Sequence, residues 1–239
     1  MFRSRLGLFS LAAMLATFAV LASSASAAIK FEWKVGGKTL GAGESREATT
    51  NSDGRAFSIR ATVAGAEALL LSSELSVEPG SKIIGGKPGT GEGTLVLKGV
   101  TVDKPEKCAA ESEGAPTGTV KSNPTLSQIV ESEETHEPLV LFAPKTGTIF
   151  APILFLNRGT ETCAIKGALA NLTGTLLAQP LPVLTEALDG DLDFEAPTKN
   201  FFLSNGTLDK AGLVFAGNAA TLTGLSVAIL TTDENVGVF

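Results

Sequence analysis

The sequence predicts an all-β protein, most simply an antiparallel β-sandwich of the immunoglobulin-like or jelly-roll-like type. Apolar residues alternate with polar ones at a period of two, as in strands with one buried face. Glycine, asparagine, aspartate and proline interrupt these stretches at short intervals, and apolar residues at helical spacing are rare. This spacing leaves little room for the helical crossovers of a parallel sheet, so it favours stacked antiparallel sheets.

The alternation is clearest in the first half of the chain. Residues 29–35 and residues 57–63 each alternate apolar and polar side chains, and Gly36-Gly37 permits a tight turn after the first of these strands. Residues 95–102 change phase at Gly99, which is the pattern of a β-bulge.

Short apolar runs predict the later strands, over residues 139–142, 148–156, 162–169, 201–203, 213–215 and 225–231. One short helix of one or two turns is expected over Val183–Leu188, because Leu184 and Leu188 are four positions apart.

Residues 1–27 have the pattern of a secretory signal peptide. Two arginines precede an apolar run over residues 6–22, and Ala25 and Ala27 supply the small side chains that signal peptidase requires before a cut at Ala28. An uncleaved anchor helix is the alternative. No later stretch is apolar for long enough to span a bilayer, so we expect a secreted or cell-surface protein without a membrane span in its mature chain.

Two arrangements of the mature chain remain open. Residues 28–102 form an N-terminal β unit and residues 103–239 a disulfide-containing one, with Asp103-Lys104-Pro105 as the hinge, or residues 28–239 form one continuous sandwich.

The charge balance argues against nucleic acid as a partner. The chain has 19 Lys and Arg against 25 Asp and Glu, a net charge of −6, and therefore no excess of basic residues for phosphates. It has a single histidine, His136, which leaves no multi-histidine metal site.

The two cysteines, Cys108 and Cys163, allow one intramolecular disulfide, which an exported protein would form. A catalytic thiol with His136 as its base is the alternative. Each cysteine is followed by alanine and later by Thr-Gly-Thr, at residues 117–119 and 173–175. If this is a true repeat, two similar hairpins carry one cysteine each, and the disulfide joins them across facing sheets.

Calcium is the one cofactor that the sequence suggests. Asp189, Asp191 and Asp193 alternate along the chain, with Glu195 beyond them, and carboxylate oxygens at alternate positions can wrap a hard cation. The EF-hand spacing is not met. The alternative is a turn followed by the solvent-facing side of a strand.

Two glycine motifs only approach known active-site patterns. Residues 85–93 lack the first glycine and the Ser or Thr of a phosphate-binding P-loop, so a mobile surface loop is expected there. Residues 224–228 (GLSVA) end in alanine where a nucleophile elbow requires glycine.

Two segments, residues 31–45 and residues 146–163, resemble uncharacterised exported β-rich proteins of soil actinobacteria. The resemblance covers most of the mature chain and includes no catalytic motif. It implies export and an all-β fold.

Taken together, these patterns predict an exported non-catalytic β-sandwich protein with a surface-binding or cell-envelope structural role. Cell-wall or polysaccharide components are the partners we consider. A secreted, glycosidase-like hydrolase that uses paired carboxylates is the alternative, and it would require two carboxylates roughly 5–10 Å apart, one of them with a raised pKa.

Overall fold

The computed structural model describes residues 31–51, 56–63, 66–194 and 200–239. The expected signal peptide and its cleavage residues, Ala25, Ala27 and Ala28, lie outside the described residues. Within these ranges every regular element is a strand and no helix occurs, so the predicted all-β class is confirmed.

The strands, in chain order, are β1 (Trp33–Val35), β2 (Lys38–Thr39), β3 (Ser45–Asn51), β4 (Phe57–Val63), β5 (Ala66–Ser72), β6 (Glu74–Val77), β7 (Lys82–Ile84), β8 (Thr90–Gly93), β9 (Leu95–Lys98), β10 (Thr101–Lys104), β11 (Cys108–Glu111), β12 (Val120–Lys121), β13 (Thr125–Ser132), β14 (Pro138–Pro144), β15 (Ile149–Asn157), β16 (Leu169–Leu181), β17 (Gly190–Asp193), β18 (Asn200–Phe202), β19 (Leu208–Lys210), β20 (Gly212–Phe215), β21 (Asn218–Thr223), β22 (Leu225–Leu230) and β23 (Val236–Val238).

Eight strands close into a barrel, which we call the cavity barrel. Antiparallel pairing runs in the order β3, β22, β17, β16, β14, β13, β8 and β7, and β7 pairs with β3 to complete the ring. A sandwich has two sheets with open edges, whereas this closure removes the edges. The predicted sandwich is therefore corrected to a closed barrel with additional strands.

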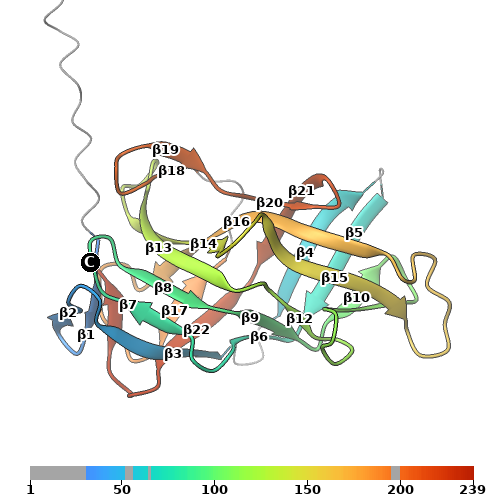
Figure 1. Ribbon diagram of the computed structural model, residues 1–239, viewed down its shortest axis with the longest axis horizontal. Coiled ribbons are helices and arrows are strands. Elements are labelled where there is room, and N and C mark those ends of the chain that lie inside the picture. Colours follow the sequence, from blue (N-terminus) through green and yellow to red (C-terminus); the bar gives the residue numbers. More distant parts are fainter. Residues whose placement is uncertain (1–30, 52–55, 64–65, 195–199) are drawn as a thin grey trace, which may run out of the picture.

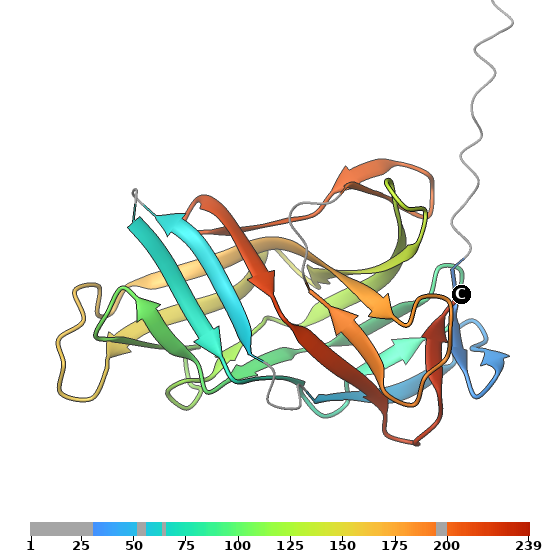
Figure 2. The ribbon, with the colours of Figure 1, turned by 180° about the vertical axis from the view of Figure 1, so that it is seen from behind.

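A second set of eight strands, which we call the packed ring, lies beside the cavity barrel along the long axis of the molecule (Figures 1 and 2). Its order is β10, β5, β4, β21, β20, β16, β15 and β11. Arg158 joins the two end strands, because its guanidinium donates to Val102 O on β10 and to Cys108 O on β11.

Two long stretches of chain belong to both rings. The first part of β16 pairs with β15 and β20 in the packed ring, and its second part pairs with β14 and β17 in the cavity barrel. Strand β21 likewise lies in the packed ring and continues through Gly224 into β22 of the cavity barrel. In each ring, a strand that precedes residue 103 in the chain pairs with a strand that follows it. Strand β3 pairs with β22 in the cavity barrel, and β4 pairs with β21 in the packed ring.

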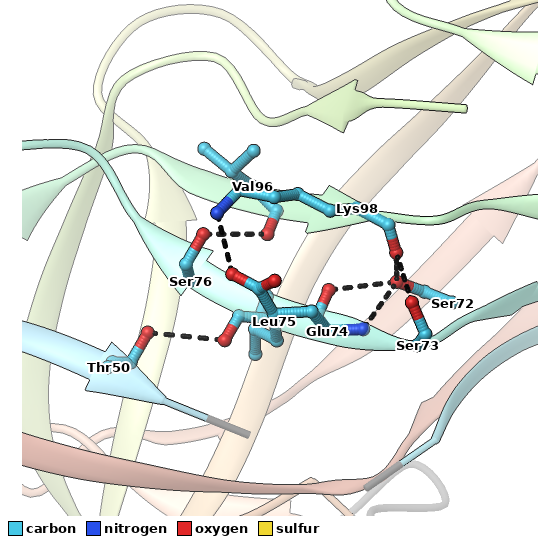
Figure 3. A network of polar contacts seen from close by, with 8 residues as sticks. All are labelled: Thr50, Ser72, Ser73, Glu74, Leu75, Ser76, Val96 and Lys98. Atoms are coloured by element: carbon cyan, nitrogen blue, oxygen red, sulfur yellow. Dashed lines mark hydrogen bonds and ion pairs between the residues drawn. The ribbon is translucent and has the colours of Figure 1, made fainter. Parts of the chain in front are cut away.

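Two small sheets cover the ends of the cavity barrel. The sheet β2-β1-β23 lies at the outer end, and the sheet β12-β9-β6 lies toward the packed ring. Figure 3 shows the polar contacts of β6 and β9: the Ser72 hydroxyl donates to Lys98 O at 2.6 Å, and the Thr50 hydroxyl of β3 donates to Leu75 O at 3.4 Å. These bonds fix the inner small sheet to both rings.

The two rings have different interiors. Large aromatic side chains fill the packed ring, including Phe57, Phe150, Phe155 and Phe215. A smaller cluster around Trp33 occupies the outer end of the cavity barrel. The β18–β19 hairpin, which rises above the ribbon in Figure 1, covers a third cluster on the outer side of β13, β14 and β16.

Three local predictions need correction. Residues 183–188 form turns and one isolated bridge instead of a helix, and Leu184 has a positive φ of 52°, which an α-helix does not accommodate. Residues 162–168 form a loop before β16. Gly99, with φ of 60°, marks the passage from β9 in the small sheet to β10 in the packed ring, and it is not a bulge within one strand.

Candidate ligand cavity

The predicted disulfide is confirmed. Cys108 and Cys163 are bonded, with their Cα atoms 4.7 Å apart, and both are almost fully buried. The bond joins β11 to the loop that follows β15, where the Cys163 N–H donates to Asn157 Oδ1 at 3.1 Å. Since no free cysteine occurs in the described chain, the catalytic-thiol alternative is wrong.

The repeated Cys-Ala and Thr-Gly-Thr segments do not form two equivalent hairpins. Cys108 lies in a strand and Cys163 in a loop, and residues 173–175 lie inside β16 whereas residues 117–119 lie in a turn region before β12. The disulfide therefore connects neighbouring parts of one wall, because β11 and β15 are paired strands, and it does not bridge facing sheets.

The three candidate calcium ligands lie in or next to one strand of the cavity barrel. Asp191 and Asp193 belong to β17, and Asp189 directly precedes that strand. Across the described ranges, no three side chains of the His, Cys, Asp and Glu types are grouped so that they could hold a metal ion. Glu195 lies outside those ranges, so calcium binding stays a prediction.

The glycine-rich segment 85–93 is packed, so the expected mobile surface loop is wrong. Gly85 and Gly89 are buried, and a Cβ atom on Gly89 would lie 2.6 Å from both Trp33 Cδ1 and Ile129 Cδ1. Gly89 also receives a backbone hydrogen bond from Ile129 at 2.9 Å. The glycines allow the chain to pass against the buried indole, which accounts for the motif without a phosphate.

The cavity barrel contains a cavity of about 110 Å³, which is not closed on all sides, because the exposed Pro182 and Thr185 belong to its lining. Each of its eight strands contributes to the lining, Trp33 and Val236 close the outer end, and Leu75 and Leu95 of the inner small sheet close the other end. Eight-stranded barrels are wide enough to hold one small ligand. The position of the cavity inside such a barrel makes it the candidate site.

Small side chains at inward positions leave this space open. Ala48, Gly190 and Ala228 all line the cavity, and a Cβ atom added to Gly190 would meet no atom closer than 3.8 Å. The packed ring has phenylalanines in its core, and two cavities there measure only about 10 and 20 Å³. The packed ring is thus filled as protein interiors normally are, whereas the cavity barrel leaves a space of about 110 Å³.

The walls of the cavity are mainly apolar. Val140 and Leu230 come from the cluster around Trp33, Leu75 and Phe194 come from the core of the packed ring, and Phe142 packs against both clusters. Most hydroxyl groups at the cavity have partners: Thr125 Oγ1 donates to Gly93 O at 2.9 Å, and Ser81 Oγ donates to Glu78 O at 2.7 Å. The walls of the cavity are therefore suited to an apolar molecule.

Three charged side chains line the cavity, namely Lys82, Glu92 and the predicted calcium ligand Asp191, and the first two are paired. Glu92 lies 3.0 Å from Lys82 Nζ and 3.1 Å from Lys145 Nζ, at the pairing of β7 with β8. The hydrogen bond from Lys82, followed by that from Lys145, holds the pKa of Glu92 below the usual 4.5 of glutamate. The carboxylate stays ionised in this arrangement and is neutralised by its two neighbours.

Glu92 should therefore stabilise the folded chain at neutral pH and lose this effect in acid. A carboxyl group with a lowered pKa in the folded chain contributes stability that is complete above pH 4.5 and is lost as the pH falls through the lower folded value. We expect Glu92→Gln to lower the urea midpoint slightly at pH 7 and by less at pH 3. The exposed Glu113→Gln variant is the control, and an equal loss at both pH values would contradict the assignment.

A search of protein-family models, curated proteins and solved structures finds no match to this chain. Among the described residues, no helix has both the length and the apolar character that crossing a membrane requires.

Sequence reasoning missed the cavity. Its signal is present in the chain, since small residues occupy inward positions of β3, β17 and β22 where a filled core would have large ones. Reading that signal requires knowing which face of each strand points inward, and this depends on how the barrel closes.

Proposed function

We propose that this chain is an exported or cell-surface binding protein without catalytic activity, whose barrel cavity holds a small apolar molecule. The cavity of about 110 Å³ carries the proposal. In another protein, a dry cavity of about 150 Å³ with aliphatic and aromatic walls binds benzene, so this space suits a ligand of similar size. The apolar walls would supply most of the binding free energy.

Several observations favour binding over the hydrolase alternative. His136 is an exposed residue whose Nδ1 lies 2.7 Å from Glu131 Oε1, away from the cavity lining. A glycosidase acid needs a raised pKa. Within the described residues the two carboxyl groups with a clear shift, Glu67 and Glu92, are shifted down, Glu67 chiefly by its hydrogen bond from Lys104.

Export, and cell-wall or polysaccharide partners on the outer surface, belong to the same proposal. They depend on the expected signal peptide in residues 1–27. A pull-down of the chain against purified cell wall and polysaccharides tests the partners separately from the cavity.

Benzene binding, measured by titration calorimetry, tests the cavity directly. We expect wild-type protein to bind benzene and Ala228→Leu to bind it at least about tenfold more weakly, because the larger side chain occupies the cavity. Gly190→Ala is a milder variant, since an added Cβ would approach no atom closer than 3.8 Å.

The matched control is Ala219→Leu, at an exposed position of β21 in the packed ring. This variant should bind benzene as the wild type does. Absence of benzene binding in the wild type, or equal binding by Ala228→Leu and the wild type, would contradict the proposed function.

A further inference from the structure

One hydroxyl group in the cavity lacks a hydrogen bond. Ser226 lines the cavity and is completely buried, and its Oγ has no partner among the described residues. The other oxygen of this kind in the described chain, Asn171 Oδ1, does not belong to the cavity lining. Native proteins leave few buried polar groups unpaired, so such a group at a ligand cavity calls for a partner from outside the chain.

The strand geometry places the Ser226 side chain on the inner face of β22. Side chains alternate along a strand, so Ser226 shares a face with Ala228 and Leu230, which also line the cavity. Leu230 belongs to the buried cluster around Trp33, which identifies this face as the interior. Ser226 stands opposite Leu192 of β17, itself an apolar part of the lining.

We propose that the Ser226 hydroxyl forms the single directional hydrogen bond to the ligand, an inference that rests on the proposed function. The ligand class is then a small, uncharged, mainly apolar molecule with one hydrogen-bonding group, such as an alcohol, a phenol or a ketone. A hydroxyl can both donate and accept, so each of these groups can pair with it.

An ionised ligand is disfavoured by its surroundings. Three charged side chains line the cavity: Lys82 and Glu92 pair with each other at 3.0 Å, and Asp191 of β17 also has an interaction partner. A further charge in an apolar cavity would lack compensation, and burying an unpaired charge is far more costly than burying a neutral polar group. The cavity therefore selects neutral molecules.

The same geometry argues that Ser226 binds and does not act as a nucleophile. A nucleophilic serine needs an adjacent base, and the one histidine of the chain, His136, lies in the exposed β13–β14 connection beside Glu131. Ser226 also lies within the regular strand β22, whereas the nucleophile elbow is a strand-to-helix turn.

Phenol and benzene, titrated separately into the full chain, distinguish the two levels of the proposal. We expect Ser226→Ala to weaken phenol binding about tenfold, the usual scale of a lost hydrogen bond, and to leave benzene binding within about twofold of wild type. The exposed Ser45→Ala variant of β3 is the control and should bind both probes normally. The unfolding midpoint of ligand-free Ser226→Ala should not fall, because this hydroxyl has no partner in the chain to lose.

The outcomes separate the two claims. Benzene binding with phenol affinity unchanged by Ser226→Ala overturns the role of Ser226 and leaves the cavity as an apolar binding site. An equal loss for both probes also overturns it, since the change would then concern cavity shape. Failure of both probes to bind the wild type overturns the proposed function together with this inference.

Discussion

Replacing Cys108 and Cys163 together by alanine is expected to lower the free energy of unfolding by about 4 kcal/mol. The two residues are 55 positions apart, and a cross-link over a loop of that length removes a corresponding amount of chain entropy from the unfolded state. The bond also fixes the loop after β15 against β11, next to the point where Arg158 joins β10 and β11. Urea titration followed by the fluorescence of Trp33, the single and buried tryptophan, measures the loss.

The wild-type protein under reducing conditions provides the matched comparison. Its unfolding midpoint should approach that of the double variant, and the double variant should not respond to the reductant. A loss below about 1 kcal/mol would show that the hydrogen bonds of the loop, including that from Cys163 N to Asn157, hold this part of the packed ring without the cross-link.

Features that depend on neighbouring residues could be predicted from the sequence. The alternation over residues 57–63 coincides with β4, because the period of two is a local consequence of strand geometry. The disulfide could be predicted from composition, since two cysteines in a chain that is expected to be exported have only one possible partner each. Export itself stays a prediction.

Closure of the strands could not be predicted in this way. A sandwich and a barrel share the same alternation, and they differ in whether the outer strands meet, as β7 meets β3 here. The double role of β16 is likewise invisible locally, because its 13 residues form one continuous strand whose partners change halfway.

The candidate site shows the same limit. Residues 224–228 resemble an incomplete nucleophile elbow in sequence, whereas the proposed role of Ser226 is to bind a ligand. Only the pairing of β22 with β17 and β3 turns Ser226 and Ala228 toward the interior. The acidic Asp189, Asp191 and Asp193 can be recognised in the sequence by their charge alone, whereas a small residue that points inward can be recognised only when the fold is known.

Gly224→Ala is expected to lower the free energy of unfolding by about 3 kcal/mol. Gly224 has φ of 147°, which side-chain-bearing residues rarely adopt, and an added Cβ would lie 2.7 Å from Cγ of the fully buried Phe57. Backbone strain and overpacking each cost about 1–3 kcal/mol. Urea titration of the variant measures their sum.

A control variant separates the two causes. Gly217 also has a positive φ, of 82°, but a Cβ there would meet no atom within 4 Å. Gly217→Ala should therefore show the strain alone, at about 1–2 kcal/mol. In a Phe57→Leu background the cost of Gly224→Ala should shrink, because the smaller side chain relieves the collision. Equal costs in both backgrounds would place the whole effect in the backbone.

The position of Gly224 gives this substitution a consequence for binding as well. The chain passes at this residue from β21 in the packed ring to β22 in the cavity barrel, so the collision is relieved by a shift either of β22 or of Phe57 on β4. Phe57 belongs to a densely filled aromatic core, whereas β22 borders a cavity that can accommodate movement. We therefore expect β22 to move, carrying Ser226 with it, so that Gly224→Ala weakens phenol binding more than benzene binding at temperatures where the variant is still folded.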